Sequence, residues 1–545
     1  MKLKKVTALI MATVVAACAM AGCGKKEEGA DSANTEKESA TQEGSVDSSG
    51  EEEKEEAAAP EKIVFPLEET MEFTSFSMMN GDFTLDTNLV MQTSMENANI
   101  NITFDSVAPI DLVEKRNLIL ASGEYPDMLY KAQLGGNDLA KYGAQGILIP
   151  LEDLIRQHAP NLSAVLDERD AWQYLESEDG HIYALPEIGN PFPSITTFWI
   201  NKKWMDQCGL EEPKNFDELY HVLKTFKEED ANGNGDPDDE IPLVCNDGAC
   251  PPTKLIAYEA FGYDYDTGTA LIDGELTYMP LTDEYKEFIR FLVKLYQEGL
   301  MDKNSFTQEY EQQHAIGQAN DVMGAFFDSS PVLTVGNERY KDYIALTPFQ
   351  EGTFPISTGI TPASLSITDA CERPDVLIAW ADQFYSEEGG ILAIMGIEGE
   401  TYSVNEDGTW DWIVGNGYGD DVGTVRANAT IQGAANHPSI WPAYYDNMNP
   451  EADPAGVYGT AETNKVTAMG KPALPSMKYS EEETKTIATI RADISDYSTQ
   501  YVAQVITGEL DLDESWDEYV STLEAMEIEE LVGVYRAAYD RAVSK

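Results

Sequence analysis

Cysteine, histidine and basic residues are scarce in this chain of 545 residues. The six cysteines form neither a disulfide framework nor a zinc-ligand spacing, although Cys245 and Cys250 stand close enough either to close a small loop or to remain free. The five histidines occur singly, so they do not suggest a metal cluster. The sequence also lacks a Gly-x-Ser-x-Gly elbow, a Walker loop and a His-Glu-x-x-His zinc helix, which argues against the enzymes built on them.

The charge balance is strongly acidic, with 97 acidic and 36 basic residues and a formal net charge of −61. Such a charge argues against nucleic acid or an anionic surface as a partner. It is typical of an exported protein that stays soluble in a cation-rich exterior. After the amino terminus, no uncharged apolar run is long enough to span a membrane.

The amino terminus has the pattern of a secretory signal. Three lysines precede an apolar run that ends at Ala21-Gly22-Cys23, which predicts a lipoprotein signal over residues 1–22 and a lipid on the Cys23 sulfur. Cys18 is a rival acceptor that would leave a shorter apolar core, and ordinary secretion with loss of Cys23 is the other alternative. Each buried lipid methylene contributes about 0.8 kcal/mol, so several chains would hold a soluble domain at the outer face of the cell membrane.

Residues 23–62 are expected to be a disordered acidic tether. From Gly24 to Lys62 there are 13 acidic and 5 basic residues and no aromatic residue. Such a segment cannot bury enough apolar surface to fold.

Residues 230–242 contain a pattern of oxygen ligands. Side-chain oxygens occur at alternate positions and Gly235 follows at the sixth, as in the first half of an EF-hand, but Ile241 occupies the twelfth, where a glutamate belongs. The alternative is a polar turn that binds nothing. We expect one structural calcium ion, with Asp238, Asp239 or Glu240 completing a shell that begins with the following residues: Asp230, Asn232, Asn234 and Asp236.

Strand and helix patterns alternate along the remaining chain, which predicts an α/β fold with largely parallel sheets. Expected strands cover 63–65, 101–104 and 127–130. Expected helices cover 88–97, 111–122 and 283–298, with others beginning after Asn215 and at Pro374 and one over the last 30 residues.

Several blocks, in this order, resemble the family 1 extracellular solute-binding proteins of ABC importers, in particular the oligosaccharide-binding lipoprotein branch. The blocks are Asn117–Asp127, Asn201–Trp204, Phe216–Leu219, the 230–242 loop, Leu295–Leu300, Val322–Phe327, Gly396–Tyr402 and Tyr535–Asp540. The resemblance extends from about residue 70 to 543. In alginate-binding relatives the corresponding loop holds calcium, although the loop here has one additional acidic residue.

The resemblance implies a type II periplasmic-binding-protein-like fold of two α/β lobes joined by a multi-strand hinge. We expect an N-terminal lobe of 63–195 and 362–437 and a C-terminal lobe of 196–361 and 438–545. Crossings are expected near 193–199, 357–364 and 438–444. It further implies a monomeric receptor, not an enzyme, that closes on its solute and delivers it to the transmembrane subunits of an ABC permease.

An oligosaccharide is the expected solute, because a sugar ring presents an apolar face that stacks on aromatic side chains while its hydroxyls pair with polar groups. Few basic residues flank the candidate aromatics, which favours a neutral glycan. For each candidate, packing in the core or hinge is the alternative, and Trp410 and Trp412 are interpreted as hairpin packing. The candidate ligand contacts are Phe76, Tyr130, Trp199, Phe327, Asp328, Trp441 and Tyr444.

Two other function classes remain open from the residues alone. A secreted glycosidase or lyase would need two carboxylates across a cleft, and 97 acidic residues do not exclude such a pair. A scaffold or adhesion lipoprotein would have no closing cleft.

Overall fold

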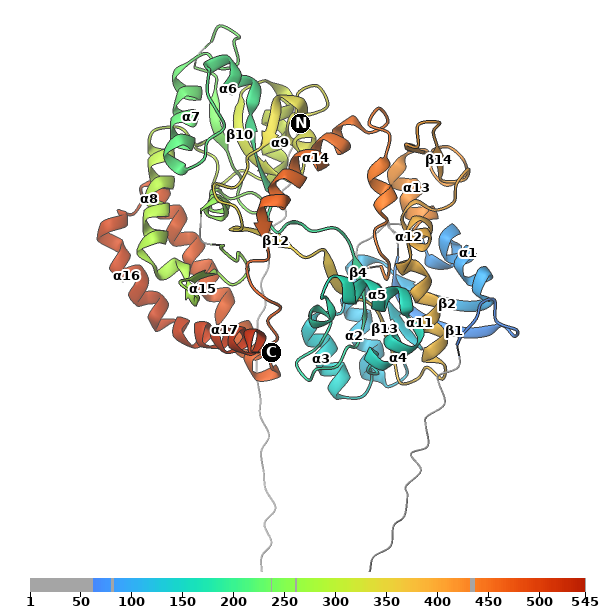
Figure 1. The fold of residues 1–545 in the computed structure, drawn as a ribbon. Coiled ribbons are helices and arrows are strands. Elements are labelled where there is room, and N and C mark those ends of the chain that lie inside the picture. The colour runs from blue at the N-terminus through green and yellow to red at the C-terminus, as the bar shows by residue number, and fades with distance from the viewer. Residues whose placement is uncertain (1–61, 80–82, 237, 260–261, 432–436, 545) are drawn as a thin grey trace, which may run out of the picture. The chain divides into compact units, whose positions relative to one another are not determined.

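The computed structural model describes residues 62–79, 83–236, 238–259, 262–431 and 437–544 (Figure 1). The predicted signal, the Cys23 lipid site and all of the tether except Lys62 lie outside these residues. None of the helices in the described part is both long and apolar enough to cross a membrane.

The first lobe is built on a five-stranded sheet with the order β2-β1-β3-β13-β4. Its strands are β1 (Met71–Met78), β2 (Ile100–Val107), β3 (Met128–Tyr130), β4 (Leu185–Ile188) and β13 (Ile360–Ile367). Its helices are α1 (Leu89–Ala98), α2 (Leu112–Ser122), α3 (Gly136–Ala144), α4 (Glu152–His158), α5 (Pro160–Glu168), α11 (Pro374–Asp382), α12 (Glu387–Met395) and α13 (Val422–Ala429). Segments distant in sequence share one core here, because α11 and α12 pack with residues of β1, β2 and α1 (Figure 1).

The second lobe is built on a four-stranded sheet with the order β11-β6-β10-β7. Its strands are β6 (Thr197–Asn201), β7 (Ile241–Val244), β10 (Met323–Asp328) and β11 (Tyr343–Ala345), with a separate hairpin of β8 (Thr269–Ile272) and β9 (Glu275–Tyr278). Its helices are α6 (Lys202–Cys208), α7 (Phe216–Glu228), α8 (Asp283–Gln297), α9 (Tyr310–Ala319), α10 (Pro331–Val335), α14 (Pro454–Met469), α15 (Glu481–Thr507), α16 (Leu512–Ala525) and α17 (Ile528–Val543). The three C-terminal helices pack with α8 in the core of this lobe (Figure 1).

A small sheet of β5 (Phe192–Pro193), β12 (Phe354–Ser357) and β16 (Gly470–Lys471) lies where the chain passes between the two larger sheets. β5 leads into β6, and β12 leads into β13. A further segment runs beside β4, because Ile188 N–H donates to Ser439 O (2.9 Å) and Trp441 N–H donates to Ile188 O (2.8 Å). Several separate strands therefore connect the lobes.

Local sequence signals explain the clearest helices. Asn215 Oδ1 accepts from Glu218 N–H (2.8 Å) at the start of α7, while the Glu218 carboxylate accepts from Lys214 N–H (2.9 Å). α8 begins in the same way, with Thr282 Oγ1 accepting from Tyr285 N–H (3.2 Å). Trp410 and Trp412 lie on β15 (Trp410–Trp412), which pairs with β14 (Tyr402–Val404), as predicted.

Two expectations about the sheets are wrong. Residues 63–65 form no strand, and the first strand begins at Met71. The sheets are mixed: β1 is parallel to β2 and β3, but β13 is antiparallel to β3 and β4, and β6 is antiparallel to β10 and β11. The reason is that β6 and β13 enter their sheets from the connecting strands rather than through a crossover helix.

Candidate functional site

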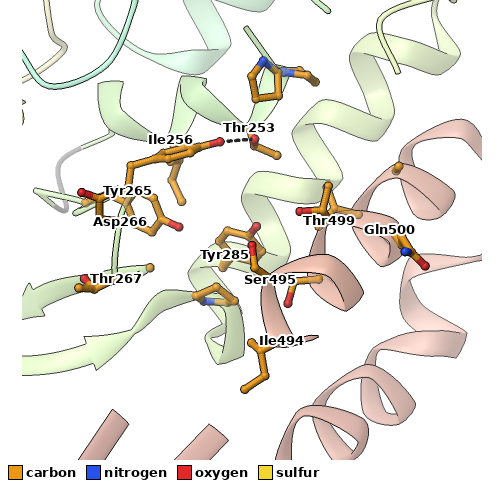
Figure 2. Close-up of a pocket in the computed structure, with 18 of the residues that line it drawn as sticks. Thr253, Ile256, Tyr265, Asp266, Thr267, Tyr285, Ile494, Ser495, Thr499 and Gln500 are labelled. Atoms are coloured by element: carbon orange, nitrogen blue, oxygen red, sulfur yellow. Dashed lines mark hydrogen bonds between the residues drawn. The ribbon is translucent and has the colours of Figure 1, made fainter. Parts of the chain in front are cut away.

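A cavity of about 470 Å³ lies in the second lobe, within the usual size range of small-molecule sites. Its walls come from the 3-10 helix η4 (Pro252–Tyr258), the β8–β9 hairpin, α8 and α15 (Figure 2). We call it the tyrosine pocket after its five tyrosines, which are Tyr263, Tyr265, Tyr278, Tyr285 and Tyr535.

Local sequence patterns explain the shape of the β8–β9 hairpin and the polar face of α15. The β8–β9 hairpin turns at Asp273-Gly274, both of which have positive φ (51° and 86°), as a type I′ turn requires. On α15, Ser495, Ser498 and Thr499 follow helical spacing, so their hydroxyls lie on one face and line the pocket. Figure 2 shows Ser495 and Thr499. Opposite them, Tyr265 and Thr253 share a hydrogen bond between their hydroxyls (2.9 Å).

Hydroxyl groups and apolar surface line the pocket together, and it carries little charge. Burial raises the pKa of Tyr278 to about 12 and raises the pKa values of Tyr263 and Tyr285 well above the usual phenol value. These phenols are therefore neutral at physiological pH and act as hydrogen-bonding groups. Only three charged side chains line this cavity in the described part of the chain, namely Asp247, Asp266 and Arg491. The site suits a neutral ligand with many hydroxyls.

Four of the aromatic residues predicted to contact ligand lie in the hydrophobic core. Phe76, Tyr130, Trp199 and Phe327 are each at most 1% exposed. Because β-strands of both sheets carry them inward, their rings offer no face to a ligand in this conformation. As ligand contacts they remain predictions; in the structure they pack against the core.

Asp328 is fully buried at the end of β10, and both of its carboxylate oxygens are already hydrogen-bonded. Oδ1 accepts from the Tyr310 hydroxyl (2.6 Å), and Oδ2 accepts from the Thr334 hydroxyl (2.6 Å) and from His314 Nε2 (2.9 Å). This network gives Asp328 a structural role, since it connects β10 to α9 and α10.

Trp441 and Tyr444 differ from the other predicted aromatics because both keep exposed surface. Trp441 Nε1 donates to Glu187 Oε1 (3.1 Å), and His437 Nε2 lies 3.3 Å from the same oxygen. We call Trp441, Glu187 and His437 the Trp441 corner. The Tyr444 hydroxyl donates to Gly408 O (3.1 Å), which fixes that ring against the β14–β15 hairpin.

The 230–240 loop folds around its own carboxylates. Asp230 Oδ2 accepts from Gly235 N–H (2.9 Å), and Gly235 has a φ of 91° that only glycine adopts without strain. The two asparagine amides, Asn232 Nδ2 and Asn234 Nδ2, donate to Asp239 (2.8 and 2.7 Å). Asn232 and Asn234 thus both contact Asp239, through their amide nitrogens.

Two oxygens in this loop have no partner despite being buried. Asp230 Oδ1 and Glu240 Oε2 are both without a hydrogen bond among the described residues, and burial raises the pKa of Glu240. Unpaired buried carboxylate oxygens are costly, and a bound cation would satisfy them. Among the described residues, no three His, Cys, Asp and Glu side chains form a ready metal site, so calcium would require the asparagine amides to turn their oxygens inward.

Comparison with known proteins places these features in a family. Residues 89–391, more than half of the chain, match the model of the bacterial extracellular solute-binding proteins. The fructooligosaccharide ABC transporter substrate-binding protein FusA of Streptococcus pneumoniae serotype 4 is 26% identical over 511 residues, covering 88% of this chain and 92% of FusA.

Solved structures agree with this match. An EF-hand mutant of S. pneumoniae FusA in complex with fructo-nystose has a TM-score of 0.64 at 25% identity and covers 87% of this chain and 100% of its own. A human-milk-oligosaccharide (HMO) binding, ABC-transporter-associated solute-binding protein from Bifidobacterium longum infantis has a TM-score of 0.72 at 21% identity, covering 86% and 99%. The chain belongs to the bacterial extracellular solute-binding proteins.

This solute-binding protein has the predicted two-lobed α/β fold, and the family prediction is confirmed. Its matched relatives are solute-binding proteins rather than enzymes. The tyrosine pocket and Glu187 were not among the candidate site residues predicted from the sequence. Nothing local signals either of them, because the pocket joins segments as distant as Asn246 and Tyr535, and Glu187 meets Trp441 and His437 from the distant segment beside β4. Cys245 and Cys250 are buried free thiols, so the alternative of a bridge is wrong here.

Proposed function

We propose that this solute-binding protein captures a neutral oligosaccharide and delivers it to the transmembrane subunits of an ABC permease. The observation that supports this most is the tyrosine pocket, where neutral phenols and serine and threonine hydroxyls surround a cavity with few charges. Tyrosine rings stack on the apolar faces of sugars, and hydroxyls pair with hydroxyls. The similarity to FusA supports the same ligand class.

The direct test is titration calorimetry of the purified chain against a panel of linear glycans. The panel contains mono- and trisaccharides of glucose, galactose, mannose, xylose and fructose, together with trigalacturonate and a tripeptide. We expect one neutral trisaccharide to bind at a one-to-one ratio and to be recovered intact by chromatography. Cleavage of the glycan would favour the enzyme alternative, and preferential binding of the peptide would contradict the ligand class.

We also propose two aromatic contacts outside the tyrosine pocket, Trp441 and Tyr444. Both stand in the segment between α13 and α14, which runs beside β4, and both retain accessible surface. The segment from Ile440 to Tyr445 packs on the first-lobe core, so we place the third passage between the lobes after Met448 rather than at 438–444. The first lobe would then comprise about 63–190 and 360–448, with the remainder in the second.

Anchoring through Cys23 is the second part of the proposal. Cleavage after Gly22 and lipidation of Cys23 would leave the acidic tether of residues 24–62 between membrane and receptor. Cys23→Ser should release the protein into the medium or leave an uncleaved precursor, whereas Cys18→Ser should remain anchored as the matched control. Release caused by Cys18→Ser alone would assign the anchor to Cys18.

A structural calcium ion in the 230–240 loop is the third part. We assign its ligands to Asp230, Asn232, Asn234, the Asp236 carbonyl, and Asp239 with Glu240. The reason for choosing Glu240 over Asp238 is that Glu240 is buried with one unpaired oxygen, while Asp238 is exposed.

Calcium at a hundredfold excess over its Kd would stabilise the fold by about 2.7 kcal/mol. A chelator should therefore lower the Tm of the wild type and of Asp238→Asn, but not that of Glu240→Gln. Protons should compete with calcium for the Glu240 carboxylate, whose pKa burial raises, so calcium binding should weaken at acidic pH. If the chelator leaves the Tm of the wild type unchanged, the loop does not bind a stabilising calcium ion.

A further inference from the structure

A second cavity of about 530 Å³ lies along α15, next to the tyrosine pocket. We call it the α15 groove. Its lining includes Tyr479, Thr484 and Ile487 of the second lobe and Asn137 of the first. Unlike the tyrosine pocket, it therefore presents groups from both lobes.

The two cavities meet at one turn of α15. Arg491 and Ser495 line both of them, and both side chains are exposed. Since these residues stand four positions apart on one helix face, they mark a shared border rather than two separate openings. A ligand leaving the tyrosine pocket across Ser495 enters the α15 groove.

Asn137 marks the first-lobe end of this path. It lies in the first turn of α3, and its Oδ1 accepts a hydrogen bond from the Thr484 hydroxyl (3.0 Å). This bond joins α3 to α15 and lies at the exposed surface. A ligand in the groove would contact both lobes at the point where they already touch.

We propose that the ligand is a linear, uncharged oligosaccharide whose terminal unit occupies the tyrosine pocket and whose following units extend across Ser495 to Asn137. The inference rests on the proposed function and adds the chain length and orientation of the ligand. A single sugar would fill only the tyrosine pocket and contact only the second lobe. A chain long enough to reach Asn137 contacts both lobes and so favours the closed state.

The charges along the path support an uncharged ligand. Among the described residues that line either cavity, Arg491 is the only cation, against the acidic side chains Asp247, Asp266 and Asp496. Arg491 also lies 3.9 Å from Asp266, which partly neutralises it. A chain of uronate units would place repeated negative charges beside these carboxylates.

Ser495→Trp tests the path, because an indole at this exposed position would fill the border between the cavities. Asp493→Trp is the matched control, since Asp493 is exposed on the same helix but lines neither cavity. Both variants would be titrated with the trisaccharide of the glycan panel that binds the wild type most tightly. We expect Ser495→Trp to weaken binding at least about tenfold, equivalent to 1.4 kcal/mol, and Asp493→Trp to bind like the wild type.

Chain length and charge are tested on the wild type. The matching monosaccharide should bind at least about tenfold more weakly than the trisaccharide. Small-angle X-ray scattering should show a smaller radius of gyration with the trisaccharide and no change with the monosaccharide. Trigalacturonate should not compete.

Each other result contradicts a defined part of the inference. If the wild type binds no glycan of the panel, the proposed function fails and this inference fails with it. If the wild type binds but Ser495→Trp binds equally well, or both tryptophan variants lose affinity equally, the path is wrong and the function stands. Equal affinity for mono- and trisaccharide overturns the bridging, and preference for trigalacturonate overturns the uncharged ligand.

Discussion

The tyrosine pocket of the second lobe and the Trp441 corner of the first both combine aromatic rings with polar groups, but they differ in charge. The pocket is lined by phenols whose pKa values burial raises, so these groups stay neutral across physiological pH. The corner surrounds Glu187 with a buried histidine, and the buried Lys131 lies near enough to be affected by its charge.

Burial disfavours the charged form in both regions, but it lowers pKa values in the corner and raises them in the pocket. Loss of water lowers the pKa of Lys131 to about 7 and that of His437 to about 4, because the charged forms are disfavoured. In the pocket the same effect simply keeps phenols in their neutral state. The phenols of the pocket therefore keep the same charge around neutral pH, while protonation in the corner affects the stability of the fold.

Tyr130 gives the largest expected effect and tests whether first-lobe aromatics serve the core. Its ring packs edge-on against Phe104 (6.2 Å between centroids, 76°), and its hydroxyl is buried without a partner among the described residues. By analogy with Phe→Ala, Tyr130→Ala should cost about 3–5 kcal/mol of stability in urea denaturation. Tyr130→Phe should be neutral or stabilising, since it removes an unsatisfied hydroxyl. If Tyr130→Ala has normal stability but does not bind glycan, Tyr130 is a ligand contact and not only a core residue.

The pH dependence of stability tests the charge of the corner. Between pH 6.5 and about 4 the unfolded chain binds a proton at His437 that the folded chain does not, so stability should fall as the pH falls through this window. The shift corresponds to on the order of 3 kcal/mol. The charged groups that affect His437 are Glu187, Lys131 and Arg426.

Comparing the wild type with His437→Gln separates the contribution of His437 from that of the carboxylates that titrate in the same pH range. Denaturation at several pH values should show a shallower loss of stability in the variant than in the wild type. Identical pH profiles for the two proteins would contradict the assignment to His437. Glycan affinity, by contrast, should show little change over the same window if the tyrosine pocket dominates binding.

Trp441→Ala tests whether the ligand contacts the Trp441 corner in addition to the tyrosine pocket. Loss of a stacking surface should weaken glycan binding by about 1–3 kcal/mol in calorimetry. Trp412→Ala is the matched control, because Trp412 is also half-buried but packs on Trp410 in the β14–β15 hairpin. Unchanged affinity in Trp441→Ala would confine the ligand to the pocket and the α15 groove.

Tyr265→Phe is expected to have the smallest effect. The change removes only the hydroxyl that pairs with Thr253 while keeping the ring in the pocket wall. Affinity should fall by about 0.5–1.5 kcal/mol, the usual net value of one hydrogen bond, with no change in Tm. A loss of stability in place of affinity would show that this pair is structural.

The sequence predicted what depends on local patterns. Helices with clear caps, such as α7 after Asn215 and α8 after Thr282, were expected close to their observed positions. The order of the family blocks was enough to predict the two-lobed fold. Strand direction was not predictable in this way, because β13 and β6 enter their sheets through connecting strands that have no sequence signature.

The candidate site was harder to predict for a physical reason. The local sequence around an aromatic residue does not show whether the ring faces the core, as that of Trp199 does, or keeps accessible surface, as that of Trp441 does. The tyrosine pocket needs η4, the β8–β9 hairpin and α15 to meet, and no local pattern encodes that meeting. For the 230–240 loop the candidate ligands are close together in sequence, so they could be named residue by residue, and calcium binding there stays a prediction.

Calorimetric titration of the wild type with matched neutral and uronate trisaccharides tests whether the protein captures a neutral oligosaccharide. We predict one-to-one binding of a neutral trisaccharide that is recovered uncleaved, and no heat above dilution from trigalacturonate. Binding of trigalacturonate in preference to every neutral glycan, or heat from none of them, would contradict it.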